Sequence, residues 1–289
     1  MNNFLKLICL LVLLSFNAAF NYAQSLEVGV DYTYTNIDHA ALDATPGDTI
    51  LVHEGSYHGG IQIVDLKGTE ADWITIMAAE NEEVIFQGGT NTQFSDAEYV
   101  EIKGFIFQGQ TGNGLNIDDA GSIETPTHHI RVIDCTFRDI DASGNNDFLK
   151  LSGLDSFLIS NCRFVDGAEG GSGIDMVGCH YGNISDNEFL NLGSNSIQAK
   201  GGTQFIRIER NYFENCGLRN INLGSSTGLQ FFRPLDAPFE AADLQVYANI
   251  FIGGWAGLAY VGSTRVDVAN NTFIMPENWV FRILQETVD

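Results

Sequence analysis

Two cationic residues in neighbouring repeats of the sequence, Lys200 and Arg219, are of types that could carry out proton-transfer chemistry together. A neutral lysine can remove a proton, and an arginine can stabilise the negative charge that then develops. β-Elimination in a uronic acid needs both groups, together with a donor for the leaving oxygen. The alternative is that Lys200 is a solvated lysine at a strand end and Arg219 an ion-pair partner in a loop.

A column of polar residues is predicted beside this pair. A second series of apolar segments can be aligned on an inward aliphatic residue, and the next position is then polar in four successive segments. Adjacent coils of a solenoid lie about 4.8 Å apart, so these side chains would form an outward stripe that suits sugar hydroxyl groups. The stripe consists of Lys150, Asp175, Gln198 and Asn222. Asn195, in the turn before one of these strands, is expected to be exposed.

A long insertion, residues 225–242, replaces what should be a short turn. Long loops on rigid scaffolds often carry function. Phe231 and Phe232 could stack on sugar rings, and Arg233 could hold a carboxylate with both ends of its guanidinium. Alternatively, the loop folds back over the coils and buries both phenylalanines.

These residues must be positioned by a repeated unit, because one short phrase recurs down the chain. In each copy apolar residues alternate, which is the period of a β-strand, and a break of two or three residues precedes a second strand that starts at Phe. The seven copies are residues 100–107, 130–137, 157–164, 182–189, 206–213, 244–251 and 266–273. A ladder of stacked side chains is predicted two residues before Phe, where the chain has Cys135, Cys162, Asn187, Asn211, Asn249 and Asn271.

The spacing of the copies predicts the fold. Successive Phe residues lie about 24 residues apart, except where two loops enlarge the repeat, and the second series of apolar segments gives each coil three strands. Crossovers between parallel strands are right-handed, so we predict an all-β fold, a single-stranded right-handed parallel β-helix. A short amphipathic helix in residues 34–44 would cap its first coil. No capping pattern follows the strand-like residues 279–284, as expected if the natural chain is longer.

The amino terminus, residues 1–23, has the pattern of a secretory signal peptide, because Lys6 precedes an apolar run that small residues follow. The run is too short to anchor the chain across a membrane. Residues 24–289 are therefore predicted to form one domain that is secreted or periplasmic. The cysteines that remain after cleavage are expected to be buried and reduced: Cys135, Cys162, Cys179 and Cys216.

The charge of the chain limits its partners. It carries 37 acidic and 14 basic residues, a formal net charge of -23, whereas a nucleic-acid-binding protein presents a basic face. An acidic surface keeps an exported protein soluble. We expect a monomer whose partner is an extracellular polysaccharide.

The segment from Pro46 to Tyr57, followed by Gly68, Thr69 and residues 74–76, resembles the opening coils of the pectate-lyase-like superfamily. The Asn ladder matches that superfamily over essentially the whole mature chain. Among its members, the sequence is most similar to polysaccharide lyase family six, which contains alginate and chondroitin lyases. The same scaffold also carries hydrolases, epimerases and adhesins.

Family six is known for a catalytic lysine, an arginine about one coil later and a calcium ion that neutralises the uronate carboxylate. Residues 195–202 resemble its lysine strand and residues 218–219 its arginine strand, so the resemblance implies that Lys200 is the base and that Arg219 stabilises charge or holds the carboxylate. The two glutamates that bind Ca²⁺ in the family correspond to Gly193 and Asn195 here. The resemblance implies Ca²⁺, but its ligands are replaced, and Arg219, Lys150 or Arg233 would have to neutralise the carboxylate instead.

The predicted function is cleavage of a uronic-acid polysaccharide by β-elimination. The alternative is a non-catalytic protein that binds glycan, or adheres at the cell surface, through the same stripe. A glycoside hydrolase is disfavoured, because it needs two carboxylates about 5 to 9.5 Å apart and only Asp175 lies in the column.

Overall fold

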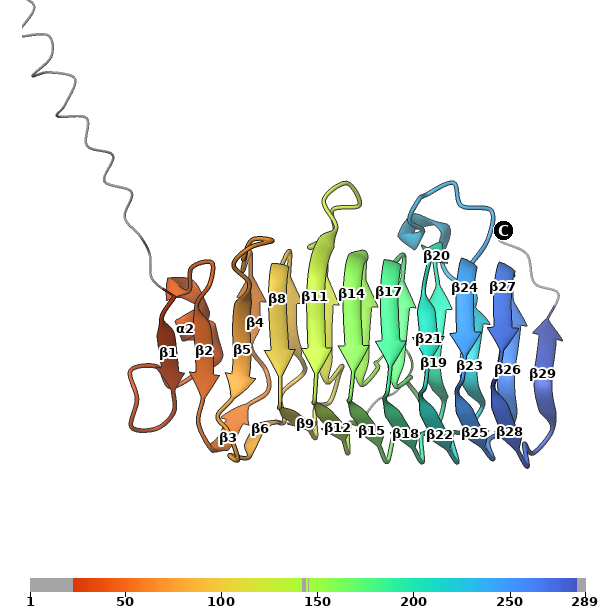
Figure 1. Ribbon diagram of the computed structural model, residues 1–289, viewed down its shortest axis with the longest axis horizontal. Helices are drawn as coiled ribbons and strands as arrows, with labels where there is room; N and C mark the ends of the chain where they lie inside the picture. The colour runs from red at the N-terminus through yellow and green to blue at the C-terminus, as the bar shows by residue number, and fades with distance from the viewer. Residues whose placement is uncertain (1–22, 142–143, 145, 285–289) are drawn as a thin grey trace, which may run out of the picture.

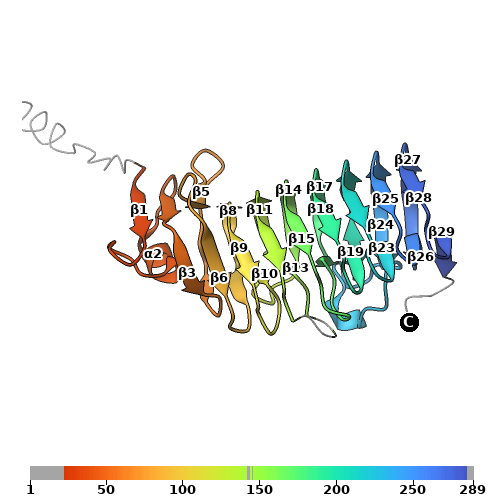
Figure 2. The same cartoon turned by 90° about the horizontal axis from the view of Figure 1, so that it is seen from below.

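The structure is a computed structural model that describes residues 23–141, 144 and 146–284. In this range the chain winds into an elongated right-handed parallel β-helix, whose coils follow one another along the long axis in Figure 1 and, turned by 90°, in Figure 2. Each regular coil contributes one strand to each of three parallel sheets, which confirms the fold predicted from the repeat. The predicted signal peptide lies outside the described residues, except for Ala23.

The three sheets, named A, B and C here, are visited in that order as the chain advances. Sheet A consists of β1 (Ser25–Val28), β2 (Thr49–Val52), β5 (Ile74–Ala78), β8 (Glu98–Lys103), β11 (Thr127–Ile133), β14 (Leu154–Ser160), β17 (His180–Ser185), β20 (Thr203–Gln204), β21 (Arg207–Glu209), β24 (Ala241–Tyr247) and β27 (Ser263–Ala269). Sheet B consists of β3 (Gly55–His58), β6 (Val84–Gln87), β9 (Ile106–Gln108), β12 (Thr136–Arg138), β15 (Arg163–Val165), β18 (Glu188–Leu190), β22 (Tyr212–Glu214), β25 (Ile250–Ile252) and β28 (Thr272–Ile274). Sheet C consists of β4 (Gln62–Val64), β7 (Thr92–Ser95), β10 (Leu115–Asp118), β13 (Leu149–Ser152), β16 (Ile174–Val177), β19 (Asn195–Lys200), β23 (Arg219–Gly224), β26 (Ala256–Val261) and β29 (Trp279–Leu284).

Phenylalanines of sheet B fill the centre of the solenoid. Their rings stack from coil to coil because the central residue of each short strand faces inward and pairs with the same position of the next strand. Ring centroids lie 4.7 to 4.9 Å apart along the stack, which confirms the predicted column and adds aromatic contact to apolar burial. The stack consists of Phe107, Phe137, Phe164, Phe189, Phe213, Phe251 and Phe273.

The Asn ladder lies at the bend between sheets A and B. Asn187 Nδ2 donates to Asn211 Oδ1 at 2.9 Å, and Asn211 Nδ2 donates to Asn249 Oδ1 at 3.1 Å. Asn211 Nδ2 also donates to the carbonyl of Ile184, while its Oδ1 accepts the backbone N–H of Asn187. Each buried amide is thus satisfied by the coils on both sides, as buried polar groups must be.

Replacing Asn211 by alanine should lower the free energy of unfolding by about 1 to 3 kcal/mol, because the amide of Asn187 and the carbonyl of Ile184 lose buried partners. Urea denaturation measures the change. The matched control is Asn278→Ala, at an exposed position, where we expect less than about 0.5 kcal/mol. Equal losses in the two variants would show that the ladder does not stabilise the solenoid.

Cys135 and Cys162 continue the ladder toward the amino end. The thiol of Cys162 lies 3.5 Å from the carbonyl oxygen of Val132, one coil away. Burial raises the pKa of the Cys162 thiol, and it raises the pKa of Cys179 to about 12. The four cysteines of the described chain are free and buried, which confirms their predicted burial, while their reduced state stays a prediction.

The single α-helix in the described residues, α2 (Ile37–Asp43), covers the first coil and contacts β1, β2 and β4. It is shorter than the predicted helix because Asn36 and Ala44 both have extended backbone, the latter two residues before Pro46. At the other end, β29 pairs with β26 in register. Within the described residues, no helix is long and apolar enough to cross a membrane.

Candidate functional site

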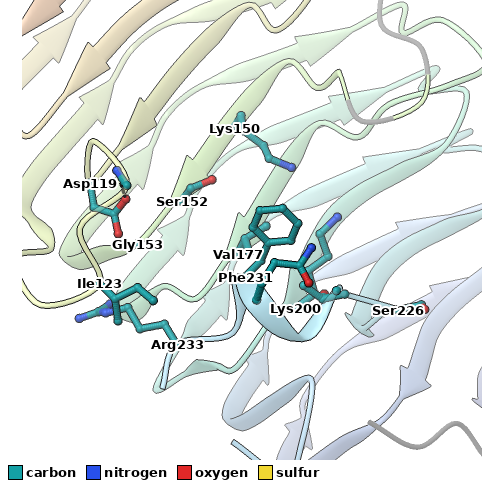
Figure 3. A pocket seen from close by; sticks show the side chains of 14 residues that line it. Asp119, Ile123, Lys150, Ser152, Gly153, Val177, Lys200, Ser226, Phe231 and Arg233 are labelled. Carbon is teal, nitrogen blue, oxygen red and sulfur yellow. Dashed lines mark hydrogen bonds between the residues drawn. The ribbon is translucent and has the colours of Figure 1, made fainter. Parts of the chain in front are cut away.

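A pocket of about 550 Å³ lies where strands of sheet C meet two loops. One loop is the turn after β10, and the other is the 225–242 insertion, which contains the 3-10 helix η1 (Leu229–Phe231). Figure 3 shows the side chains that project into the pocket from these three parts. They include Asp119 and Ile123 from the turn, Lys150, Ser152 and Lys200 from sheet C, and Phe231 and Arg233 from the insertion.

The polar column predicted from the sequence is present in the register of sheet C. Lys150 pairs with Asp175, Asp175 with Gln198, and Gln198 with Asn222. Its expected exposure is wrong, however, because Asp175, Gln198 and Asn222 are buried. The long side chains of Lys150 and Lys200 reach Asp175 from the coils on either side of it. Lys150 and Lys200 therefore face the pocket, while the other residues of the column are buried beneath its surface.

Asp175 joins the two lysines. Its Oδ2 forms an ion pair with Lys150 and lies 3.0 Å from the ammonium of Lys200, while its Oδ1 accepts a hydrogen bond from Gln198 Nε2 at 3.1 Å. The carboxylate is only 1% exposed, whereas both lysines reach solvent through the pocket. A second carboxylate, Asp147, lies 3.3 Å from the Lys150 ammonium. Two cations thus share one fully buried anion.

Burial and the charge of Asp175 raise the pKa of Asp147 to about 7. Burial acts to lower the pKa of Lys150, but the charges of Asp175 and Asp147 outweigh it and raise that pKa. Lys150 is consequently a fixed cation at neutral pH. Asp147 takes up a proton near neutral pH. Below that pH, the cluster formed by Asp147, Lys150, Asp175 and Lys200 therefore carries a net positive charge.

Because the pKa of Asp147 is raised, we predict that the free energy of unfolding falls as the pH rises from about 3.9, the pKa of an unfolded aspartate, to about 7. In this window the folded state binds the proton more tightly than the unfolded state, so each pH unit costs up to about 1.4 kcal/mol. The Asp147→Asn variant cannot ionise and should lose this decline. Denaturation midpoints at pH 4 and pH 8 test it, and parallel profiles for the two proteins would contradict it. Asp155→Asn is the control of opposite sign, because Asp155 has a lowered pKa, about 2.

Arg219 is not close to Lys200. Arg219 begins β23 and pairs with Asn195, whereas Lys200 is the last residue of β19. Five residues of strand separate the two positions, or about 17 Å, so the expectation that they act on one sugar is wrong. The repeat predicts that the two residues lie one coil apart, but it does not predict where each lies along its strand. Asn195 is also buried rather than exposed, and its Nδ2 donates to Gln198 Oε1 at 2.7 Å.

The three residues of the insertion that were predicted to bind sugar, Phe231, Phe232 and Arg233, do not all face the pocket in a way that would allow it. Phe231 is 62% exposed and lines the pocket, whereas Phe232 is fully buried, so the prediction that Phe232 stacks on a sugar is wrong. Both ends of the Arg233 guanidinium donate hydrogen bonds to Asp155, from Nη1 to Oδ1 at 2.9 Å and from Nη2 to Oδ2 at 2.7 Å. Arg233 therefore fastens the insertion to β14, and its predicted role as the holder of a substrate carboxylate is wrong.

Glu240 fastens the other end of the insertion. Its Oε1 accepts the backbone N–H of Thr227 at 2.6 Å, and its Oε2 accepts that of Gly201 at 2.8 Å. Glu240 is buried, so these charge-assisted hydrogen bonds are shielded from water. The wall that carries Phe231 is consequently fixed on both sides next to Lys200.

A comparison with family models matches residues 84–273 to the right-handed β-helix region. The chain belongs to the right-handed β-helix family. Figure 1 shows that these residues make up most of the coils of this β-helix protein, including all the strands that line the pocket. A search of curated proteins by sequence gave no match.

Solved structures similar to this β-helix protein include polysaccharide lyases and a surface adhesin. An alginate lyase from Paenibacillus sp. str. FPU-7 is 16% identical with a TM-score of 0.63, and the alignment covers 90% of this chain and 98% of that one. PfbA, a surface adhesin of Streptococcus pneumoniae, is 12% identical with a TM-score of 0.53, and the alignment covers 90% and 75% of the two chains. Identities this low show the fold that the proteins share.

The calcium ion implied by family six does not fit the residues of this β-helix protein. A Cβ atom at Gly193 would lie 2.2 Å from the carbonyl oxygen of Ala168, so no glutamate fits there without a shift of backbone. The oxygens of Asp175 are engaged by two lysines and a glutamine. Within the described residues, no three His, Cys, Asp or Glu side chains form a group that could hold a metal ion.

Proposed function

We propose that this protein is exported and that it binds a uronic-acid polysaccharide in the pocket and cleaves it by β-elimination. The observation that carries the proposal is that Lys150 and Lys200 both line one pocket and both contact the buried carboxylate of Asp175. Below about pH 7, where Asp147 is protonated, the cluster has an excess of positive charge, which favours an anionic sugar in a partly enclosed site. The predicted signal peptide and the alginate lyase among the similar structures agree with this function.

The pocket contains groups for the steps of elimination. Lys150, held charged by Asp175, would pair with the uronate carboxylate and stabilise the enolate that forms when the C5 proton leaves. Lys200, in its neutral form, would accept that proton. The electron pair of the C5–H bond then forms the C4–C5 double bond, and the bond from C4 to the glycosidic oxygen breaks. The ammonium produced at Lys200 can return its proton to the leaving oxygen.

A second candidate function is glycan binding without cleavage, as in a surface adhesin. The observation that favours it is the 3.0 Å contact between Lys200 and Asp175. A neighbouring carboxylate stabilises the ammonium form of a lysine, and an ammonium binds a carboxylate but cannot remove a proton.

A panel of polyuronates distinguishes the two functions. Polymannuronate, polyguluronate, polygalacturonate and polyglucuronate are each incubated with the protein while ultraviolet absorbance and affinity are recorded. Elimination creates an absorbing unsaturated uronate, and binding alone does not. The lyase proposal expects absorbance to rise on at least one polymer. Affinity without any rise would establish the binding function instead, and neither affinity nor a rise would refute both.

Activity and affinity should also resist a chelator. Because Lys150 replaces the calcium ion as the cation that meets the carboxylate, a millimolar excess of EDTA should leave both within about twofold, a change of less than 0.5 kcal/mol. Restoration of chelator-treated protein by Ca²⁺ would contradict this account of the pocket.

A further inference from the structure

Sheet A carries a column of residues with left-handed backbone on the coils that build the pocket. Each has a φ of 52° to 58° and interrupts the regular register of its strand, except that the last of them follows the end of β20. Figure 1 shows the strands concerned, β8, β11, β14, β17 and β20, in succession along the solenoid. We call five of these residues the aromatic column: Tyr99, His129, Ser156, Tyr181 and Phe205. The same position is left-handed in the next two coils, where it holds Asp243 and Arg265.

The residue types in the aromatic column are not those that the backbone favours. Left-handed conformations suit Gly, Asn and Asp, whereas bulky side chains are strained there. At the bend between sheets A and B, the corresponding left-handed positions are mostly filled by Gly, Asp or Asn, with Arg210 and Ala248 as the exceptions: Gly104, Asp134, Asn161, Asp186 and Asn270. Strained residues persist where they serve a purpose that a relaxed residue would not, and they cluster at functional sites.

The aromatic column contains two stacked pairs of rings. Tyr99 and His129 lie 4.4 Å apart between centroids with planes 14° apart, and Tyr181 and Phe205 lie 5.0 Å apart with planes 8° apart. Tyr181 is 59% and Phe205 45% exposed. Burial and the charge of His128 lower the pKa of His129, so that ring is neutral at neutral pH.

Ser156 separates the two pairs. Register places its coil directly between those of His129 and Tyr181. With coils about 4.8 Å apart, the two flanking rings are separated by about 9.6 Å at the backbone. A ring placed over Ser156 would lie about 4.8 Å from each, which is within the range of stacked rings. Serine is too small to stack on either ring itself, whereas an aromatic residue at this position would do so.

We propose that His129, Ser156 and Tyr181 form a slot that binds one pyranose ring, at a site separate from the Lys150–Lys200 pocket. Contact on both faces requires axial C–H groups on both faces of the sugar. Pyranoses whose substituents are all equatorial, as in β-linked glucose, meet this condition. An axial hydroxyl, as at C2 of mannose or C4 of galactose, would point at one of the two aromatic rings and be left without a hydrogen-bond partner. The slot should therefore select gluco-configured chains.

Titration calorimetry with cellohexaose, mannohexaose and β-1,4-galactohexaose tests the slot. The wild type should bind cellohexaose at least tenfold more tightly than the other two. Tyr181→Asn removes one wall and Ser156→Phe fills the gap, so each should lower that affinity at least tenfold. Ala248→Asn, a matched change to asparagine at an exposed left-handed position on another bend, should leave it unchanged. Lys200→Ala should also leave it unchanged, because the pocket is not involved.

Thermal denaturation separates loss of the slot from loss of the fold. Asparagine tolerates the left-handed backbone better than tyrosine, so Tyr181→Asn should melt at the wild-type temperature or above. Lost affinity with retained melting temperature supports the slot. The proposal is overturned if the wild type binds no cellohexaose, if it binds the three hexaoses equally, or if Tyr181→Asn and Ser156→Phe bind as the wild type does. Failure of the polyuronate panel would leave this result unaffected.

Discussion

Lys200→Ala is expected to lower the rate of β-elimination by about 10³-fold or more, since a positioned general base contributes roughly 10² to 10⁴. The affinity for the polyuronate should fall by less than about tenfold, because Lys150 keeps its contact with the carboxylate and the base acts mainly in the transition state. The variant should remain folded, since Asp175 keeps its ion pair with Lys150. Initial rates and dissociation constants on the same polymer measure both effects.

The matched control is Lys103→Ala. Lys103 is a half-exposed lysine of sheet A that pairs with Asp134 at 3.6 Å, away from the pocket. Its removal should change neither the rate nor the affinity. Full turnover by Lys200→Ala would show that another group removes the proton, and a joint loss of rate and affinity would assign Lys200 to binding alone.

Asp175→Asn should destabilise the protein by about 3 kcal/mol, because it leaves Lys150 and Lys200 partly buried without their shared counter-charge. The amide can still accept a hydrogen bond, so the loss reports mainly on charge. It should also release the two ammonium groups from their fixed positions and weaken polyuronate binding. Urea denaturation and affinity measurements test the two effects.

Asp186→Asn is the control for this charge effect. Asp186 forms an exposed ion pair with Arg210, in which both side chains are more than a third exposed. Water screens such a pair, so we expect a loss of less than about 1 kcal/mol. If the two variants were equally destabilised, Asp175 would not be the electrostatic centre of the site.

The fold could be predicted from the sequence because every coil repeats the same physical requirement. The inward Phe and the Asn two residues earlier recur at the coil period, and each stacks on or hydrogen-bonds to its counterparts in adjacent coils. Local periodicity therefore determines the long-range contacts. The column that runs from Lys150 to Asn222 followed from the same alignment, since register between parallel strands repeats as well.

The site was less predictable because its decisive contacts do not follow the repeat. Arg233 reaches Asp155, 78 residues earlier, and this pairing could not be inferred from coil spacing. Periodicity also indicates which side of a strand a residue faces, but not what covers it. Asp175 does face outward, yet the lysines on neighbouring coils bury it. Glu240 was missed for the same reason, because it acts through backbone N–H groups of the loop that it holds.

The central claim is that the pocket recognises the carboxylate of a uronic acid, with Lys150 as the cation that pairs with it. The most direct test compares the affinity of the wild type for a polyuronate with its affinity for the same polymer after reduction of the carboxyl groups to hydroxymethyl groups. Chain length, linkage and ring shape are unchanged, so the comparison isolates the charge. The account predicts that the reduced polymer binds at least about 100-fold more weakly, a loss of about 2.7 kcal/mol. Equal affinity for the two polymers would contradict it.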